Sequence, residues 1–101
     1  MITALVIREW DVPKEEDRLK TYYTPMEPSY QDIIKKFKAK DWGQWTQGVG
    51  HQTHLEEFET LEEFAKAWSD DEYKKMWTLA MRNCDNVTCR ILRKSIQVPP
   101  K

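Results

Sequence analysis

The chain has little cysteine, little glycine and no excess of charge of one sign. Its 101 residues include two cysteines and three glycines, and 16 Lys and Arg nearly balance 17 Asp and Glu. A nucleic-acid-binding protein usually has a basic excess on one face, and interspersed charge does not favour that class. No apolar run approaches membrane-spanning length, and no basic and apolar leader precedes the first strand-like run. We therefore expect a cytoplasmic protein that binds neither nucleic acid nor membrane.

The two cysteines, Cys84 and Cys89, are too few for a zinc site, which usually takes four ligands. In a reducing compartment we expect both to be free thiols. The glycosylation sequon at residues 86–88 is attributed to chance, because no secretory leader accompanies it. The sequence also lacks a nucleophile elbow and a phosphate-binding glycine loop. We predict neither a metal nor a cofactor.

Aromatic residues, in contrast, are abundant: five Trp, four Tyr and three Phe. They need a large core, an interface or a ligand to cover them. A chain of this length has room for one domain, residues 1–101, and buries a modest share of its surface alone. Association with another subunit would therefore stabilise it.

Hydrophobic periodicity and capping residues predict four strands and two helical regions. Thr60 and Glu63 form a capping box, and Ser69 and Glu72 repeat it, so we expect a helix, a kink and a second helix there. The segment 14–28 is mixed, with helical spacing interrupted by prolines. The expected elements are a strand at 2–10, a helix from Ser29 to Lys40, a strand from Gly43, a reversal at 48–50, a strand at 52–59, the two helices just described, and a strand at 87–96.

This order predicts an α+β fold of the ferredoxin-like, split βαβ type (β-α-β-β-α-β), with an antiparallel sheet and helices on one face. The first strand is apolar on both sides, and so in part is the last. Because two helices cover only one face, a second copy packing sheet against sheet would shield the other. The alternatives are a sheet that tolerates exposed apolar residues, or cover by the C-terminal tail. The apolar residues of the last strand are Cys89, Ile91, Leu92 and Ile96.

Two segments resemble a known superfamily. Residues 54–65 (HLEEFETLEEFA) and 68–73 (WSDDEY) resemble the strand end, capped helix and small-residue break of the dimeric α+β barrel proteins. That superfamily includes antibiotic-biosynthesis monooxygenases, stress-responsive barrel proteins and NIPSNAP-like proteins. The resemblance is sharp over about a third of the chain. It implies a dimeric barrel, whereas the activities of relatives range from oxygenases and isomerases to heme-handling enzymes and proteins of no known activity.

The resemblance also implies residue roles. Phe58 matches an aromatic residue that in heme-degrading and quinol-oxidising relatives faces a pocket between sheet and helices. Many relatives have a His near the middle of the next helix, where this chain has Ala67 and Trp68, so no heme ligand is expected there. An Asn used by cofactor-free oxygenases late in the first strand is also absent, and residues 8–10 (Arg-Glu-Trp) occupy that region.

His54 is the candidate catalytic base. Strand alternation places it on one face with Glu56 and Phe58, and a His beside a carboxylate can act as a base near neutral pH. His51 points to the opposite face, so the two histidines cannot easily bind one metal. The alternative is that His54 is an ordinary hydrogen-bonded histidine in a strand pair.

The other candidates would bind or enclose a ligand. Arg8 and Arg90 lie on adjacent strands and could hold a carboxylate or phenolate, or instead pair with Glu9, Glu56 or Glu57. A bulky stripe on the second helical region could be an apolar ligand wall or simply core, and a loop bearing Tyr22 and Tyr23 could act as a lid. The candidate ligand-binding residues are Arg8, Trp10, Tyr23, Glu56, Phe58, Trp68, Tyr73, Met76, Trp77 and Arg90.

These patterns favour a homodimer that binds a small, largely apolar organic molecule with a carboxylate or phenol end between sheet and helices. If the protein is an enzyme, the resemblance favours cofactor-independent monooxygenation or isomerisation. A non-catalytic structural or stress-associated dimer is the main alternative. An RNA-binding ferredoxin-like module is a third, although the first strand lacks exposed aromatic residues for base stacking.

Overall fold

The computed structural model describes residues 3–23, 30–48 and 50–94, and for 21–23 the backbone only. Strands β1, β3 and β4 and the helical pair after β3 agree with expectation to within a few residues. The elements in chain order are β1 (Ala4–Asp11), α1 (Glu16–Tyr23), α2 (Tyr30–Ile34), β2 (Ala39–Gln47), β3 (His51–Phe58), α3 (Leu61–Ser69), α4 (Asp71–Arg82) and β4 (Asp85–Arg93).

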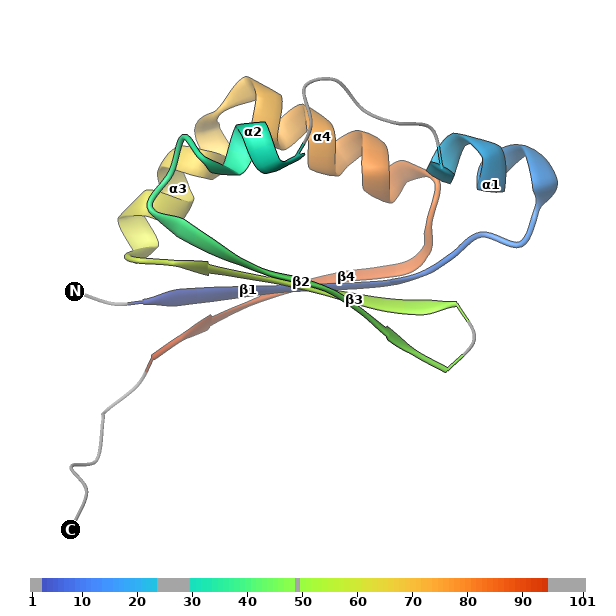
Figure 1. The fold of residues 1–101 in the computed structure, drawn as a ribbon, viewed down its shortest axis with the longest axis horizontal. Coiled ribbons are helices and arrows are strands. Elements are labelled where there is room, and N and C mark those ends of the chain that lie inside the picture. The colour runs from blue at the N-terminus through green and yellow to red at the C-terminus, as the bar shows by residue number, and fades with distance from the viewer. Residues whose placement is uncertain (1–2, 24–29, 49, 95–101) are drawn as a thin grey trace, which may run out of the picture.

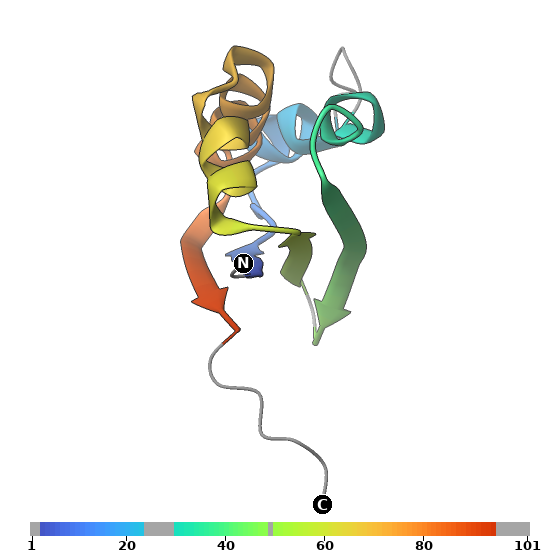
Figure 2. The same ribbon diagram turned by 90° about the vertical axis from the view of Figure 1, so that its left-hand side faces the viewer.

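The four strands form one antiparallel sheet in the order β2-β3-β1-β4. The described helices lie on the same side of it, with α3 and α4 along one flank and α2 above β2 (Figures 1 and 2). This arrangement confirms the ferredoxin-like α+β fold. Among the described residues, no helix is both long and apolar enough to cross a membrane.

Capping residues set the start of both helices after β3. The Thr60 hydroxyl accepts a hydrogen bond from the amide of Glu63, as the capping box predicts. The second cap is Asp70, whose carboxylate accepts from the amide of Tyr73, and the prediction of Ser69 as the cap was wrong. Ser69 instead donates from its hydroxyl to the carbonyl of Ala65 within the preceding turn. Helix α4 therefore begins one residue later than expected, after the predicted kink.

The helix predicted from Ser29 to Lys40 is much shorter than expected. Helix α2 ends at Ile34, and β2 begins at Ala39, four residues before the predicted start. The amide of Glu59 donates to the carbonyl of Lys38, which extends the pairing of β2 with β3 toward the helix. Sheet pairing thus outweighs the helical preference of this segment. The prolines at 25 and 28 lie outside the described residues.

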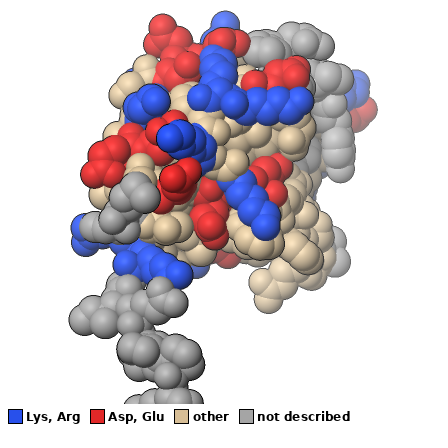
Figure 3. Space-filling view, turned by 60° about the vertical axis from the view of Figure 1, so that its left-hand side comes forward, with Lys and Arg blue, Asp and Glu red and all other residues tan. Residues whose placement is uncertain are grey.

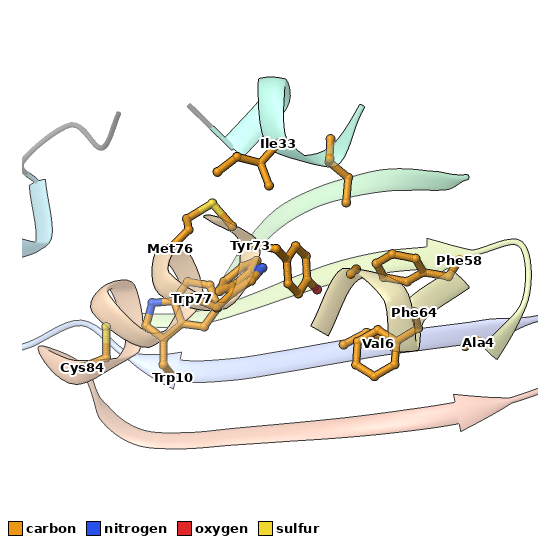
Figure 4. Packing of buried hydrophobic residues seen from close by; sticks show 12 residues of the cluster. Ala4, Val6, Trp10, Ile33, Phe58, Phe64, Tyr73, Met76, Trp77 and Cys84 are labelled. Atoms are coloured by element: carbon orange, nitrogen blue, oxygen red, sulfur yellow. The ribbon is translucent and has the colours of Figure 1, made fainter. Parts of the chain in front are cut away.

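The core lies between the sheet and the helices and is rich in aromatic rings (Figure 4). The rings of Phe58 and Phe64 meet edge to face, and Phe37 packs in the same way on Tyr73. Such contacts add to the stabilisation from burial. The buried apolar residues are Ala4, Val6, Trp10, Ile33, Ile34, Phe58, Phe64, Ala67, Tyr73, Met76, Trp77 and Cys84.

The other face of the sheet has an aliphatic patch at its centre. Leu5 is paired with Leu92 of β4, and Ile7 with Leu55 of β3. Of these, Leu92 is 46% exposed. Acidic and basic residues flank the patch, and Trp45 on β2 adds a 60% exposed ring on the same face. We call Leu5, Ile7, Leu55 and Leu92 the sheet patch.

The contribution of β4 to this face differs from the prediction. Ile91 and Cys89 pair with Val6 and Arg8, so their side chains lie on the helix side of the sheet. Both are exposed there, because β4 is an edge strand. Ile96 lies outside the described residues. Both cysteines are free thiols, as predicted.

The charged side chains form local pairs of opposite sign. Lys36 contacts both Asp70 and Glu72, and Arg18 contacts Asp85. On the face shown in Figure 3, basic and acidic side chains are interspersed over the helices. That face therefore presents no extended basic surface of the kind that binds nucleic acid.

Candidate functional site

A buried ion pair with two tyrosines lies between the sheet and the helices. Glu56 of β3 is fully buried and lies opposite Val6 of β1. Arg8, two residues further along β1, reaches the Glu56 carboxylate with an N···O distance of 2.5 Å. The Tyr73 hydroxyl accepts from Arg8 at 2.8 Å and donates to the same carboxylate oxygen at 2.6 Å. The Tyr30 hydroxyl donates to the other oxygen at 2.6 Å. Each of the four side chains in this cluster therefore has a hydrogen-bond partner within it.

The electrostatics of this cluster favour the ion pair. Burial alone would lower the pKa of Arg8, but the charge of Glu56 and the hydrogen bonds raise it above its ordinary value. Burial, followed by the charge of Glu56, raises the pKa of both Tyr30 and Tyr73. Both tyrosines therefore remain protonated donors. The Arg8 guanidinium also lies 4.1 Å from the ring centroid of Trp77, within the range of a cation–π contact.

His54 lies beside this cluster, with its orientation set by a carboxylate. It is 5% exposed, and its Nε2 is 3.0 Å from Oδ1 of Asp41 on β2. An ionised carboxylate only accepts hydrogen bonds, so Nε2 holds the proton and Nδ1 has the free lone pair. Burial is the largest cause of the lowered pKa of His54, ahead of the opposing charges of Glu56 and Asp41. The imidazole is therefore neutral near pH 7.

Asp41 is itself held in place by an irregularity of β2. The register of β2 against β3 shifts between Asp41 and Gly43. Gly43 has φ of +87°, and its amide donates to Oδ1 of Asp41 at 2.8 Å. The other oxygen accepts from the side-chain amide of Gln31 at 3.0 Å. The bulge thus aims the carboxylate at His54, a use of bulges that recurs near functional sites.

Two buried polar atoms have no hydrogen-bond partner among the described residues: Nδ1 of His54 and Nε1 of Trp77. Their rings are in contact, with centroids 4.9 Å apart. The Tyr30 ring stands edge-on to both, at 5.1 Å from His54 and 5.8 Å from Trp77. Trp10 packs against Trp77 from the sheet side (Figure 4). Unpartnered buried polar atoms are rare, and each points to a missing partner.

The structure brings together five of the eleven residues that the sequence proposed. The hydrogen bonds, ion pair and ring contacts given above link five of them into one network: Arg8, His54, Glu56, Tyr73 and Trp77. The prediction that His54, Glu56 and Phe58 share a buried face is confirmed, and so is the opposite orientation of His51. The remaining buried candidates, Trp10, Phe58 and Met76, belong to the surrounding core.

Three proposed residues lie elsewhere or are not described. Arg90 pairs with Ile7 and so lies on the outer face of the sheet, where its side chain contacts Glu9 at 3.5 Å. Arg90 therefore does not share the buried site with Arg8, and the alternative expectation holds: Arg8 pairs with Glu56 and Arg90 with Glu9. Trp68 is 45% exposed on α3, although its ring touches Tyr73. Tyr23 ends α1, and its side chain lies outside the described part of the chain.

Sequence reasoning missed two members of the site. Tyr30 falls within the predicted helix from Ser29 to Lys40, and nothing in the sequence indicates that its hydroxyl has a partner 26 residues away. Asp41 was placed outside β2, because the strand was expected to begin at Gly43. The one available indication was the glycine two residues after an Asp within a strand-like segment, which is typical of a bulge.

Solved structures share this fold over nearly the whole chain. A conserved protein from Methanosarcina mazei Go1 superposes with a TM-score of 0.65 at 17% identity, covering 94% of this chain and 95% of that one. A NIPSNAP family protein of unknown function from Agrobacterium tumefaciens C58 gives 0.59 at 14% identity, covering 96% and 92%. An uncharacterised NIPSNAP-like domain protein from Burkholderia xenovorans gives 0.58 at 16% identity, covering 97% and 90%.

The fold is that of the NIPSNAP-like proteins. The resemblance drawn from residues 54–65 and 68–73 is thereby confirmed at the level of the fold. Neither a scan of protein-family models nor a search of curated proteins finds a match. At these identities a NIPSNAP-like fold fixes the architecture, and the function must be argued from the site itself.

Proposed function

We propose that this protein is a homodimer that binds a small, largely apolar organic molecule between the sheet and the helices. The observation that supports this most directly is the pair of unpartnered buried atoms, Nδ1 of His54 and Nε1 of Trp77. Leaving a buried polar group unsatisfied costs about 1–3 kcal/mol. A ligand that satisfies both atoms recovers that free energy, and the surrounding rings supply an apolar wall.

The site also has the elements of a general base. Asp41 accepts from Nε2 of His54, so a proton taken up by Nδ1 creates an imidazolium that is stabilised by the adjacent carboxylate. Proton abstraction of this kind is the first step of both cofactor-independent oxidation and isomerisation. We propose His54 as the base, Asp41 as its positioning residue and Trp77 as the donor to the charge that develops on the ligand.

The sheet patch is proposed to be the dimer interface. Four aliphatic side chains at the centre of a sheet face, with Trp45 nearby, favour contact with another protein surface. Both charge signs occur on the same face, in Arg90 beside Glu9 and in Lys40 opposite Glu57. A surface that has both signs around an apolar centre can complement itself across a two-fold axis.

Two neighbouring residues of β4 provide a matched test of the dimer. Leu92 and Ile91 are 46% and 44% exposed, and they lie on opposite faces of the sheet. We expect Leu92→Lys to convert the dimer into a monomer in analytical ultracentrifugation at micromolar concentration, whereas Ile91→Lys should remain dimeric. A monomeric wild-type protein, or equal effects of both substitutions, would contradict the proposed interface.

Ligand binding is tested by native mass spectrometry of the freshly purified protein. We expect an additional mass of a small organic molecule on each subunit of the wild type. His54→Ala should lose this mass and, if the protein is an enzyme, its turnover. A wild-type protein that carries no ligand and binds none from a fragment library, as measured by ligand-observed NMR, would contradict the proposed binding function.

A structural, non-catalytic dimer is the second candidate, and one observation favours it. Arg8, Glu56, Tyr73 and Tyr30 are hydrogen-bonded to one another, so this half of the interior needs no ligand. Under this hypothesis the dimer forms as proposed, but the fragment library gives no binding and His54→Ala changes only the stability. The two experiments above therefore separate the candidates.

A further inference from the structure

We infer that the interface between two copies of this chain extends from the sheet patch over a polar cluster around His51, and that protonation of His51 strengthens the dimer. The cluster consists of Glu9 and Asp11 of β1, His51 of β3 and Arg90 of β4, and we call it the His51 cluster. This inference rests on the proposed dimer and specifies both the extent of its interface and its regulation by pH.

The His51 cluster continues the sheet patch along the same face of the sheet, the one turned away from the helices (Figure 1). On β1, Glu9 and Asp11 follow Ile7 at steps of two residues, so all three side chains point to this face. On β3, His51 is paired with Asp11, and on β4 Arg90 is paired with Ile7. The patch and the cluster therefore form one continuous surface.

A stable dimer needs more surface than the sheet patch offers. Standard interfaces bury about 800 Å² on each partner and involve about 20–30 residues a side. The patch consists of four aliphatic side chains, and even with Trp45 it provides only part of that area. The next side chains along β1 on this face are those of Glu9 and Asp11. An interface of standard size centred on the patch therefore reaches the cluster.

His51 bridges two carboxylates through both of its ring nitrogens. Its Nδ1 lies 2.8 Å from Oδ1 of Asp11, and its Nε2 lies 3.2 Å from Oε1 of Glu9. A neutral imidazole has one N–H and the imidazolium has two, whereas an ionised carboxylate only accepts. Only the protonated ring therefore donates to both carboxylates. In agreement with this geometry, the hydrogen bonds to Asp11 and then to Glu9 raise the pKa of His51 above its ordinary value.

The neighbouring strands do not replace the charge of His51. Gln47 of β2, which is paired with His51, is uncharged. Arg90 of β4 contacts Oε2 of Glu9 at 3.5 Å, the oxygen that His51 does not use. When His51 is neutral, Arg90 can thus balance the charge of Glu9, but the charge of Asp11 loses its partner.

The other neighbours of Asp11 leave its negative charge in place. The side-chain amide of Asn86 donates to Oδ2 of Asp11 at 2.7 Å but is uncharged. The charge of Lys14 acts on Asp11 more weakly than that of His51. Asp85, paired with Asp11 across the two strands, is a further carboxylate, and its own ion-pair partner lies on α1. Deprotonation of His51 therefore makes this end of the face negative.

Dimerisation makes that negative charge costly. Two-fold symmetry places the cluster of each copy in the same interface, where water is excluded and an unpaired charge is disfavoured. In the protonated cluster, His51 and Arg90 together balance Glu9 and Asp11, so no net charge is buried. The dimer therefore takes up protons as it forms. Its affinity is highest below the ordinary histidine pKa of about 6.5 and falls as pH rises through the raised pKa of His51.

The test is analytical ultracentrifugation of the full chain at about pH 6 and about pH 8.5, on either side of the ordinary histidine pKa. A concentration series at each pH gives the dissociation constant of the dimer. Uptake of one proton by each subunit permits a change of up to about a hundredfold per pH unit, so we expect the constant to rise at least about tenfold between the two conditions. A dimer with the same constant at both would overturn the inference but keep the proposed interface. A monomer at both would overturn both.

Two variants of His51 separate its charge from its contacts. His51→Gln is neutral throughout, so its dissociation constant should be the same at both pH values and higher than that of the wild type at the lower one. His51→Arg stays charged and has donors for two carboxylates, so it should dimerise tightly at both. Any other group that titrates in this range acts alike in all three proteins. A pH dependence of wild-type size in His51→Gln would overturn the inference.

The wild type alone decides if a variant does not fold. Dilution calorimetry near neutral pH in phosphate and in Tris, two buffers with different heats of ionisation, measures the protons exchanged when the dimer dissociates. Because binding and protonation are reciprocally linked, we expect dissociation to release protons, and the heats in the two buffers should differ accordingly. Equal heats in both buffers would overturn the inference.

Discussion

Replacing Glu56 by Gln should destabilise the protein strongly, although the two side chains have nearly the same shape. The Glu56 carboxylate is fully buried and accepts from Arg8, Tyr73 and Tyr30. In the variant, Gln can still accept through one oxygen, but the Arg8 guanidinium stays buried without an opposite charge. The new amide group also takes the place of an acceptor for Tyr30, so two donors face each other.

The expected cost follows from the burial of both partners. Removing one partner of a buried ion pair costs about 3–5 kcal/mol. A domain of this size has a total stability of about 5–15 kcal/mol, so the variant should retain a folded state with little margin. With a urea m-value of about 2 kcal/mol/M, a loss of about 4 kcal/mol lowers the unfolding midpoint by about 2 M.

The assay is urea unfolding followed by tryptophan fluorescence, at one fixed chain concentration because dimerisation makes stability concentration-dependent. The control is Glu59→Gln, an exposed acidic residue that follows β3, which should change stability by less than about 0.5 kcal/mol. A loss below about 1 kcal/mol for Glu56→Gln would refute the closed ion pair in solution.

Further predictions concern pH and helix capping. Hydrogen bonding, first to Asp11, raises the pKa of His51, whereas burial lowers the pKa of His54. Proton NMR should therefore show one histidine titrating above about 6.5 and the other below it. The stability that His51 contributes is lost as pH rises through its folded pKa, whereas His54 destabilises the fold as pH falls below 6.5. His51→Gln and His54→Gln should therefore change the pH dependence of stability in opposite directions. Parallel changes would contradict these assignments. Asp70→Ala should lower the free energy of unfolding by about 0.5–2 kcal/mol through loss of the α4 cap. Ser69→Ala should have little effect, and the reverse order would mean that Ser69 is the cap.

The sequence predicts the fold well because the local patterns agree with one another. β1, β3 and the capped helix after Thr60 each have a strong pattern within a few residues, and their order permits few topologies. The prediction for the segment between Tyr30 and Gly43 fails because its helical periodicity competes with pairing to β3, which lies far along the chain. Local patterns do not contain that information.

The site is predicted in part for a similar reason. Strand alternation alone places His54 and Glu56 on the buried face, and that prediction is confirmed. Asp41, which orients His54, depends on a bulge in a neighbouring strand, and such a register shift is not visible in the hydrophobic pattern. Arg90 shows the opposite error: its strand was placed correctly, but its side chain lies on the outer face.

The most direct test of the account is the indole N–H of Trp77. The chain has five tryptophans, so a ¹⁵N-labelled sample gives five indole resonances, and the one missing from Trp77→Phe belongs to Trp77. On addition of a fragment that binds in the ligand-observed NMR screen, we predict a saturable downfield shift of this resonance, because its N–H gains an acceptor, and no such shift with a fragment that does not bind. A Trp77 resonance that stays in place while the exposed tryptophans move would contradict the proposed site.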